Sequence, residues 1–270
     1  MIKRHRKAFT LIELLTVISI IGILSTIALV NMKGSNDKAR LAAGKSFEAS
    51  IGRAVGDQII GEWLFNEGSG TTAGDTSGNG HNGTLSGASW TAGINGGALN
   101  FVSGNAVMLG GDASLNPPNF TITAWVKPGD FSGSYDYIYS NDRDCCGVYN
   151  GIGFRLANNK LLAEIWNGAA AYLWSNQTIS NNQVWTFVAF SYNGNKMAVY
   201  INGQLDNTLS TALGVGSPAS YTSYIGALAC CTSLGFNGSI DQMRLYGSAI
   251  VAANIEKMYL AERDRYLAKK

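Results

Sequence analysis

An apolar run near the N-terminus constrains this chain more than any other feature of its sequence. The run extends over 22 residues, from Phe9 to Val30, and contains one charged residue, Glu13. An α-helix rises about 1.5 Å per residue, so this run would span roughly 33 Å, enough to cross the apolar core of a bilayer. Cleavable secretory signals have a shorter apolar region followed by an Ala-x-Ala-like site, a pattern that this sequence lacks. The sequence therefore predicts a retained membrane helix.

The charged residues before the run predict its orientation. Lys3, Arg4, Arg6 and Lys7 precede it, and clusters of Lys and Arg stay on the cytoplasmic side of a membrane. These four cations also account for the formal net charge of +2, because the rest of the chain carries 16 Lys and Arg against 18 Asp and Glu. No basic patch is left for phosphate groups, so we expect no nucleic-acid binding by the globular part.

Glu13 is a costly residue inside an apolar helix. A carboxylate near the centre of a membrane helix costs about 2.5 kcal/mol or more, and less toward an end. We expect its partner to be the amino group produced by cleavage between Ala8 and Phe9, supplied by a neighbouring subunit. Such a pair would offset the desolvation of the charges and set the axial register of packed helices. The alternatives are that Glu13 reaches the membrane interface or stays protonated.

The run KAFTLIELLTVISIIGIL resembles the N-terminus of type IV prepilins and pseudopilins. The resemblance implies that a prepilin peptidase cleaves after Ala8 and methylates Phe9, and that Glu13 is the glutamate that the family uses in assembly. Two positions depart from the family pattern: Ala8 stands where Gly is usual, and Val30 stands where many pilins have a helix-kinking Pro. The implied partners are the peptidase, the membrane and other pilin subunits, in a homopolymer or a mixed filament. One helix would hold the chain in the membrane before assembly into an extracellular filament.

A second helical pattern follows a polar break at residues 31–37. Phe47, Ile51, Val55 and Ile59 recur every four residues and form one apolar stripe. We expect this stripe to pack against the globular domain or against neighbouring subunits. A flexible stalk is the alternative.

From about Ile60 the hydrophobic pattern changes to a period of two, which is typical of half-buried strands. Asn193-Gly194 lies between two alternating segments and indicates a hairpin. Strands are expected at 60–66, 97–101, 106–110, 119–127, 152–157, 160–167, 185–192, 196–203, 221–227 and 237–247. So many short strands with turn residues between them predict an antiparallel sandwich. Most of the six tryptophans are expected in its core.

Three segments resemble laminin-G-like, concanavalin A-type jelly-roll domains: EWLFNEGSGTTAGDTSGNGHNGTL, VWTFVAFSYNGNKMAVYINGQLDNTLS and FNGSIDQMRLYGSAI. The resemblance implies a module for carbohydrate or protein binding, or a passive structural domain. A C-terminal helix follows, with Ile255, Met258, Tyr259 and Tyr266 on one face, and it is too charged to cross a membrane. The fold class is therefore α+β. We expect four segments: a leader at residues 1–8, a membrane and assembly helix at 9–58, the jelly-roll sandwich at 59–248 and the C-terminal helix at 249–270.

Asp75 begins a loop rich in oxygen ligands, Asp-Thr-Ser-Gly-Asn-Gly-His. Calcium takes six to eight oxygen ligands from carboxylates and carbonyls, and such loops supply both. In similar jelly rolls, an Asp in this loop and one in the last strand motif, here Asp241, approach a common site. The resemblance therefore implies a structural calcium held by Asp75 and Asp241, with Asn79 or loop carbonyls helping. The alternative is an Asx-turn at Asp75, with Asp241 capping the loop by hydrogen bonds without metal.

The four cysteines form two vicinal pairs, Cys145-Cys146 and Cys230-Cys231. Neither pair has the Cys-x-x-Cys spacing of zinc or thioredoxin-type sites, and an even number in an exported chain favours disulfides. Two bridges between the loops would pin one rim of the sandwich, whereas a bridge within each pair would be strained. Four buried thiols are the remaining alternative. Such bridges could serve only to stabilise the loops. If the rim also binds a ligand, four residues near the first pair would be available for contacts: Asp142, Arg143, Asp144 and Tyr149.

The sequence gives little support for catalysis. Beyond the leader the only histidine is His81, in a Gly-rich turn, so no Ser-His-Asp assembly is indicated. Jelly-roll glycosidases use two carboxylates roughly 5–10 Å apart, whereas Glu164 stands alone on its predicted strand. A membrane-tethered hydrolase is therefore the third hypothesis. The first is a pilin or pseudopilin that displays the sandwich outside the cell, and the second is a filament-tip adhesin that binds a glycan or a surface protein.

Overall fold

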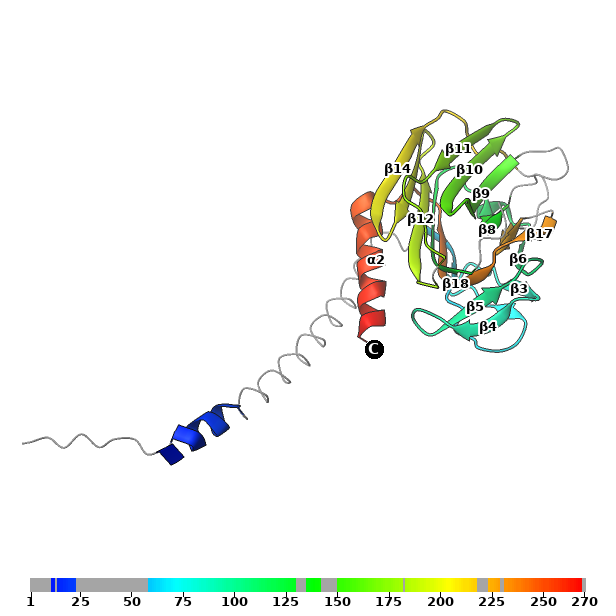
Figure 1. Cartoon of the computed structure of the whole chain (residues 1–270). Coiled ribbons are helices and arrows are strands. Elements are labelled where there is room, and N and C mark those ends of the chain that lie inside the picture. Colours follow the sequence, from blue (N-terminus) through cyan, green and yellow to red (C-terminus); the bar gives the residue numbers. More distant parts are fainter. Residues whose placement is uncertain are drawn as a thin grey trace, which may run out of the picture.

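The computed structural model of the chain describes residues 11–12, 14–22, 58–129, 135–141, 150–181, 183–217, 223–228 and 231–268. Residues 11–12 and 14–22 are helical (Figure 1). Their large apolar residues are exposed, from 45% for Val17 to 83% for Leu11. Within the described ranges, no helix has both the length and the apolar character that a membrane crossing requires. Half of the predicted membrane helix, Phe9 to Val30, lies outside these ranges.

Two antiparallel sheets form the sandwich. Sheet A has the strand order β14 (Gln204–Ser210), β13 (Lys196–Ile201), β12 (Thr186–Tyr192), β7 (Phe120–Pro128), β18 (Gly238–Tyr246), β5 (Gly97–Phe101) and β4 (Ser89–Ala92), and β1 (Ile59–Trp63) also pairs with β18. Sheet B has the order β11 (Ala170–Trp174), β10 (Lys160–Asn167), β9 (Asn150–Ala157), β8 (Asp136–Ser140), β15 (Ser223–Ile225), β6 (Ala106–Gly110), β3 (Gly83–Ser86) and β2 (Thr72–Ala73). Three small elements complete the described loops: β16 (Ala227–Leu228), β17 (Cys231–Gly235) and the 3₁₀ helix η2 (Ala113–Leu115).

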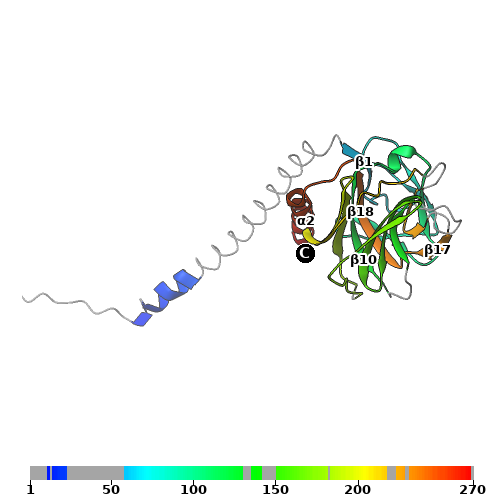
Figure 2. The same ribbon diagram turned by 90° about the horizontal axis from the view of Figure 1, so that it is seen from above.

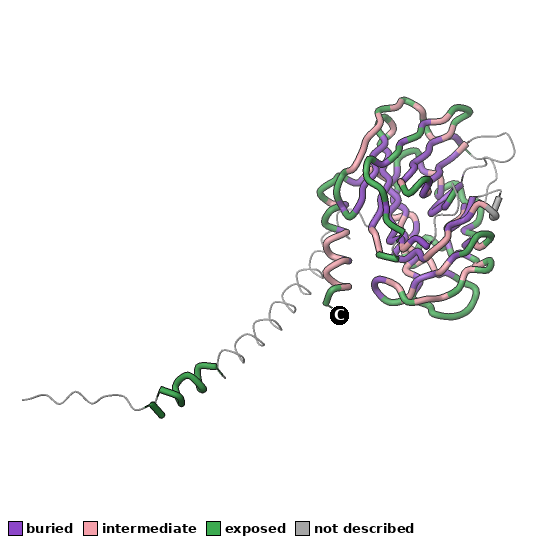
Figure 3. The backbone as a smooth tube through the Cα atoms, in the orientation of Figure 1, coloured by how far each residue is buried: buried purple, intermediate pink, exposed green. Residues whose placement is uncertain are grey.

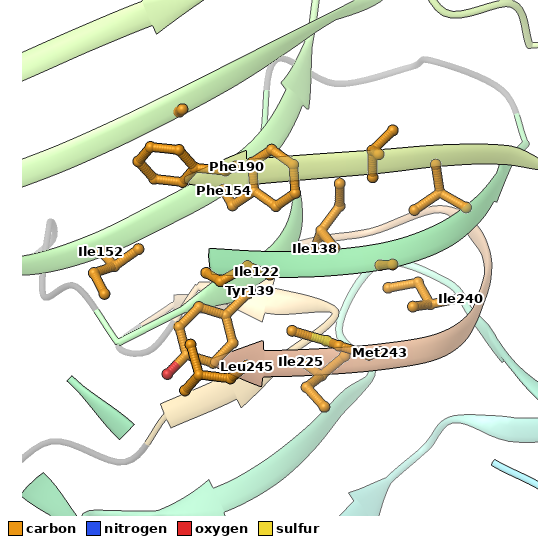
Figure 4. Close-up of a cluster of buried hydrophobic side chains, with 14 of the residues drawn as sticks. Ile122, Ile138, Tyr139, Ile152, Phe154, Phe190, Ile225, Ile240, Met243 and Leu245 are labelled. Carbon is orange, nitrogen blue, oxygen red and sulfur yellow. The ribbon is translucent and has the colours of Figure 1, made fainter. Parts of the chain in front are cut away.

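The period-two pattern in the sequence corresponds to the two faces of each sheet. In β12, Val188 and Phe190 point into the space between the sheets, whereas Phe187 and Ala189 belong to a second apolar cluster on the outer face of sheet A. In Figure 4, Phe154 of β9 lies against Phe190 of β12, and their ring centroids are 5.8 Å apart. The predicted antiparallel sandwich is therefore confirmed.

Side chains and backbone geometry fix the hairpins. The Asn193 side-chain oxygen accepts hydrogen bonds from the backbone N–H groups of Asn195 and Lys196, and Gly194 has a φ of +89°. This geometry confirms the predicted Asn-Gly turn between β12 and β13. Asn158 and Asn159, with φ values of 50° and 61°, make the corresponding turn between β9 and β10.

Helix α2 (Ala252–Leu267) covers the outer face of sheet A beside β12 and β14 (Figures 1 and 2). Its buried Ile255 and Met258 pack with Trp125 and Phe187, and Tyr259 lies 5.7 Å from the Trp125 ring. These contacts confirm the apolar helix face that the sequence predicted. Figure 3 shows that buried residues concentrate between the sheets, whereas α2 is a mixture of buried, intermediate and exposed positions.

Glu262 anchors α2 through polar contacts that the sequence did not indicate. Its carboxylate accepts a hydrogen bond from the Trp125 indole and lies 2.5 Å from Nη1 of Arg244 on β18. Arg244 also pairs with Glu62 of β1 at 2.7 Å. Burial alone would lower the pKa of Arg244, but the two carboxylates keep it above its usual value. The charges in this apolar layer are therefore paired within one chain, with one arginine between two carboxylates.

Candidate functional site

The residues predicted to direct cleavage and assembly lie outside the described part of the chain. They are Ala8, Phe9 and Glu13, so their roles stay predictions. The same holds for Cys145, Cys146 and Cys230, and for the rim residues 142–149. Cys231 is the first residue of β17, but only its backbone is described. Disulfide pairing and ligand binding at that rim also stay predictions.

Asp75, predicted as a calcium ligand, binds backbone amides of its own loop and of β1. Its Oδ1 accepts hydrogen bonds from the N–H groups of Glu62 and Ser77, and its Oδ2 accepts one from His81. Burial would raise the pKa of the Asp75 carboxyl, but these hydrogen bonds hold it below its usual range. The contact with Ser77 two residues later is the Asx-turn that the sequence left open as an alternative.

Asp241, the second predicted ligand, supports a different loop. Its Oδ2 accepts hydrogen bonds from the backbone N–H groups of Ile94 and Asn95, and its Oδ1 accepts one from Gln242. Burial raises the pKa of Asp241 to about 7 despite these donors, and the nearby Glu262 carboxylate adds to the shift. Asp241 therefore caps the turn between β4 and β5 rather than the loop at Asp75.

These residues, as they are arranged, do not fit a calcium ion. The carboxylates of Asp75 and Asp241 face backbone N–H groups, and the Asn79 side chain donates to the carbonyls of Ile59 and Ile60. A calcium site instead converges six to eight oxygens on one point. Across the described residues, no group of three or more His, Cys, Asp and Glu side chains is placed to hold a metal. Calcium binding remains an untested prediction.

His81 has polar neighbours that sequence reasoning missed. Its Nε2 lies 2.9 Å from Ser114 Oγ, and its Nδ1 lies 3.0 Å from the Ile60 carbonyl oxygen and 3.6 Å from Asp75 Oδ2. The outline resembles a catalytic triad, and Ser114 is too distant in the sequence to have indicated it. Ser114 Oγ also lies 2.7 Å from Asp112, however, and this carboxylate would oppose an oxyanion. The contacts join the 75–82 loop to η2 and β1. Absence of enzyme activity stays a prediction.

The outer face of sheet B carries a buried ion pair. Glu164 is the one carboxylate on β10, as the sequence predicted, and it lies 2.6 Å from Nη2 of Arg155 on β9. The side chains of Arg155 and Glu164 are 11% and 1% exposed. The Arg155 guanidinium lies 4.6 Å from the Tyr135 ring and 5.3 Å from the Tyr137 ring. Gly153 makes room for this pair, because a Cβ there would lie 2.6 Å from Glu164 Oε2.

An aromatic strip lies next to this ion pair. It consists of Trp166 on β10 and of Tyr172 and Trp174 on β11, the edge strand of sheet B. Tyr172 is paired with Glu164 and Trp174 with Leu162, so both point from the same outer face, roughly 7 Å apart along the strand. The Trp166 and Tyr172 rings meet edge to face at 5.3 Å. Tyr172 and Trp174 are 45% and 39% exposed.

The strip holds the two tryptophans that lie outside the apolar clusters, whereas the other four belong to the clusters or pack against them, as the sequence predicted. Trp63 and Trp125 are buried, whereas Trp90, Trp166 and Trp185 are partly exposed and Trp174 is exposed. Rigid aromatic side chains at an accessible surface are typical of binding faces, because they bury a large area at small entropic cost. The arrangement can therefore stack planar or ring-shaped groups of a ligand, beside a guanidinium that is itself stacked on Tyr135.

Family models match both parts of the chain. The model of the prokaryotic N-terminal methylation motif matches residues 3–29. The model of the concanavalin A-like lectin/glucanases superfamily, of the laminin-G type, matches residues 101–256. The predicted combination of a prepilin-type N-terminus with a jelly-roll domain is therefore confirmed. A comparison with curated proteins found no match.

Several solved structures share the fold of the sandwich. The binding domain of Paraclostridial Mosquitocidal Protein 1 superposes with a TM-score of 0.61 at 17% identity, covering 76% of this chain and 52% of that one. Domain 4 of AbnA, a GH43 extracellular arabinanase from Geobacillus stearothermophilus determined with arabinotriose, has a TM-score of 0.60 at 19% identity, covering 74% and 98%. The binding domain of botulinum neurotoxin DC, determined with rat synaptotagmin II, has a TM-score of 0.57 at 16% identity, covering 76% and 52%.

The chain spans about half the length of the mosquitocidal and neurotoxin domains that it matches. Identities below 20% establish a shared fold and leave ligands and activities open. Since the jelly-roll model covers more than half of its residues, the chain belongs to the concanavalin A-like lectin/glucanase superfamily.

Proposed function

We propose that the chain is a pilin or pseudopilin subunit of a type IV pilus-like filament and that it displays the sandwich outside the cell. The observation that carries this proposal is the methylation motif over residues 3–29, which includes the Ala8-Phe9 junction and Glu13. Cleavage at that junction frees an amino group at Phe9. An amine and a carboxylate that meet in an apolar layer offset each other's desolvation only if they pair closely.

The sandwich is suited to display because it satisfies its own packing. One apolar cluster fills the space between the sheets, and α2 covers a second cluster on the outer face of sheet A. The charged groups under α2 pair within the chain. A domain closed in this way needs no neighbour for its stability and can be carried outward by an N-terminal helix that does the assembling.

Sheared surface filaments provide the test. The chain should be recovered in them from cells that contain a functional prepilin peptidase and should stay in the membrane fraction of cells that lack it. Its abundance relative to the other subunits would separate a main subunit, present in many copies, from a rare tip protein. Equal recovery with and without the peptidase would contradict the proposal.

A second candidate function is adhesion, and the aromatic strip favours it. Tyr172 and Trp174 present two exposed rings on one strand, next to the pair of Arg155 and Glu164. Stacking on such rings is a common way to bind sugar rings or aromatic side chains. Two structures with the same fold were determined with arabinotriose, a sugar, and with rat synaptotagmin II, a protein, so both ligand classes suit this architecture.

Glycan and protein arrays probed with the full chain would test adhesion. Trp174→Ala should reduce binding of any ligand at the strip by about fivefold, since a stacked aromatic contributes roughly 1 kcal/mol. Val102→Ala removes a similarly exposed apolar side chain from the β5–β6 turn and serves as the control. Retention of every array signal by the Trp174 variant would exclude the strip as the binding site.

A further inference from the structure

A pocket of about 180 Å³ lies on the outer face of sheet A, where the chain enters α2. Strands β12, β13 and β14 form its floor, and residues 249–251 form one wall. It is therefore on the opposite sheet from the aromatic strip. Neither the assembly role nor adhesion at the strip uses it.

The floor is hollow because its central side chain is small. Ser191 on β12 pairs with Ala198 on β13, and Ala198 pairs with Thr208 on β14, so the three lie in one row across the sheet. Tyr200, two residues after Ala198, points from the same face. A larger side chain at position 198 would fill the space between Ser191 and Thr208.

The pocket combines hydroxyl groups with apolar walls. Ser191, Tyr200 and Thr208 each contribute a hydroxyl group to its lining. Leu205 and Val251 contribute apolar walls and are 51% and 64% exposed. Hydroxyl groups facing apolar surfaces suit a ligand that has both polar edges and an apolar face, as sugar rings do.

The charge of the pocket is positive. Lys196 is the only charged residue among those that line it, all of which are described. The first turn of α2 follows directly and adds to this potential, because it contains no acidic residue and Val251 provides no side-chain cap. A neutral sugar would leave the lysine without a counter-charge, whereas a carboxylate would supply one.

We propose that this pocket binds an acidic sugar, with its carboxylate on Lys196, its hydroxyls on Ser191, Tyr200 and Thr208, and its ring against Leu205 and Val251. The pocket makes the chain a receptor for uronic-acid-type groups. This role goes beyond the proposed assembly function and does not depend on it. It also does not depend on the aromatic strip.

Saturation-transfer NMR on the full chain in mild detergent tests the proposal with three probes: D-glucuronate, D-glucose and acetate. Glucuronate should bind at least tenfold more tightly than either of the others, because only it offers both the carboxylate and the ring. Lys196→Gln should lower the glucuronate affinity by about tenfold or more, since hydrogen bonds to charged groups contribute roughly 1.5–3 kcal/mol. The weak glucose signal should not change.

Three further variants make the outcome decisive. Ala198→Leu should fill the floor and abolish glucuronate binding while the thermal midpoint is kept. Lys160→Gln, which removes a lysine next to a different hairpin turn, and Trp174→Ala on the strip should both bind glucuronate like the parent chain. Equal affinities for glucuronate and acetate would overturn the sugar assignment, and unchanged glucuronate binding by Lys196→Gln would overturn the pocket itself.

Discussion

The N-terminal apolar segment and the sandwich both place carboxylates among apolar side chains, but they compensate the charge differently. Glu262 and Glu164 each have an arginine of the same chain within 2.6 Å. The segment from Phe9 to Val30, in contrast, contains Glu13 and no Lys, Arg or His. The cation proposed for Glu13 is the amino terminus that cleavage after Ala8 would create, on this chain or on another one. The buried carboxylates of the sandwich thus have partners in the same chain, whereas a pair between chains would make assembly the way to neutralise Glu13.

Glu13→Ala should produce the largest effect. We expect the variant to stay in the membrane and to fall at least tenfold in sheared filaments, because the amine of a neighbour would lose its partner. The thermal midpoint of the sandwich should not change. Glu67→Ala, which removes an exposed glutamate of the sandwich, is the matched control. Normal incorporation of the Glu13 variant would show that no pair between chains sets the assembly.

Glu262→Ala should have the opposite effect to Glu13→Ala, because it should lower the stability of the sandwich by a large amount. It leaves Arg244 with one carboxylate fewer in a buried layer and leaves the Trp125 indole without its acceptor. Removing one partner of a buried pair costs about 3–5 kcal/mol. Urea denaturation followed by tryptophan fluorescence measures the loss. Glu256→Ala on the exposed side of the same helix should cost less than about 1 kcal/mol, and a similar cost for both variants would contradict the anchoring role of Glu262.

Asp136 is a third carboxylate in an apolar environment. Its charge is neutralised by a proton at low pH and not by a cationic side chain. Its Oδ2 is buried without a hydrogen-bond partner among the described residues, and its Oδ1 accepts only from Asn237. Burial raises the pKa of Asp136 to about 6. Between about pH 4 and pH 6 the folded state therefore holds a proton on Asp136 that the unfolded chain has lost. Because the folded state binds the proton more tightly, the stability of the folded chain declines as the pH rises through this window.

Asp136→Asn should remove this part of the pH dependence. Above pH 6 the variant should be more stable than the parent chain by about 1–3 kcal/mol. Urea midpoints measured between pH 4 and pH 8 give the comparison. Two results would contradict a raised pKa for Asp136. One is a parent chain whose stability rises from pH 4 to pH 6 relative to the variant, and the other is a variant with the same pH dependence of stability as the parent chain.

Calcium removal should have the smallest effect. Asp75 and Asp241 are engaged by backbone N–H groups, so EDTA should leave the thermal midpoint within about 1 °C of its value in calcium. A ligand that binds only the folded state raises the midpoint with its concentration. A thermal midpoint that rises with calcium concentration in the parent chain, but not in Asp75→Asn, would support the calcium site that the resemblance implied.

Local patterns in the sequence were sufficient for much of the sandwich. The alternation in β12 and β13 and the Asn193-Gly194 turn between them need only neighbours along the chain. Strand β8, in contrast, is buried at every position, and β14 is mostly polar, so neither shows the alternation expected of a half-buried strand. Strand β11 alternates buried and exposed residues, so its pattern was present in the sequence although the strand was not among those predicted.

The contacts of the candidate site could be predicted only by working out which strands pair and in which register. Arg155 and Glu164 are two residues apart in register across β9 and β10, and the Asn158-Asn159 turn was a signal that could have aligned them. The contacts of Glu262 were not accessible in this way, because Trp125 lies 137 residues away and meets it only when α2 docks. Short-range chemistry was predictable, whereas contacts created by the docking of whole elements were not.

Mass spectrometry of the mature N-terminus, on chain recovered from sheared filaments, tests the central claim most directly. It reports cleavage and methylation in one spectrum. We predict a chain that begins at Phe9 with a methylated amino group. A filament-borne chain that still begins with its basic leader at Met1 would contradict the account.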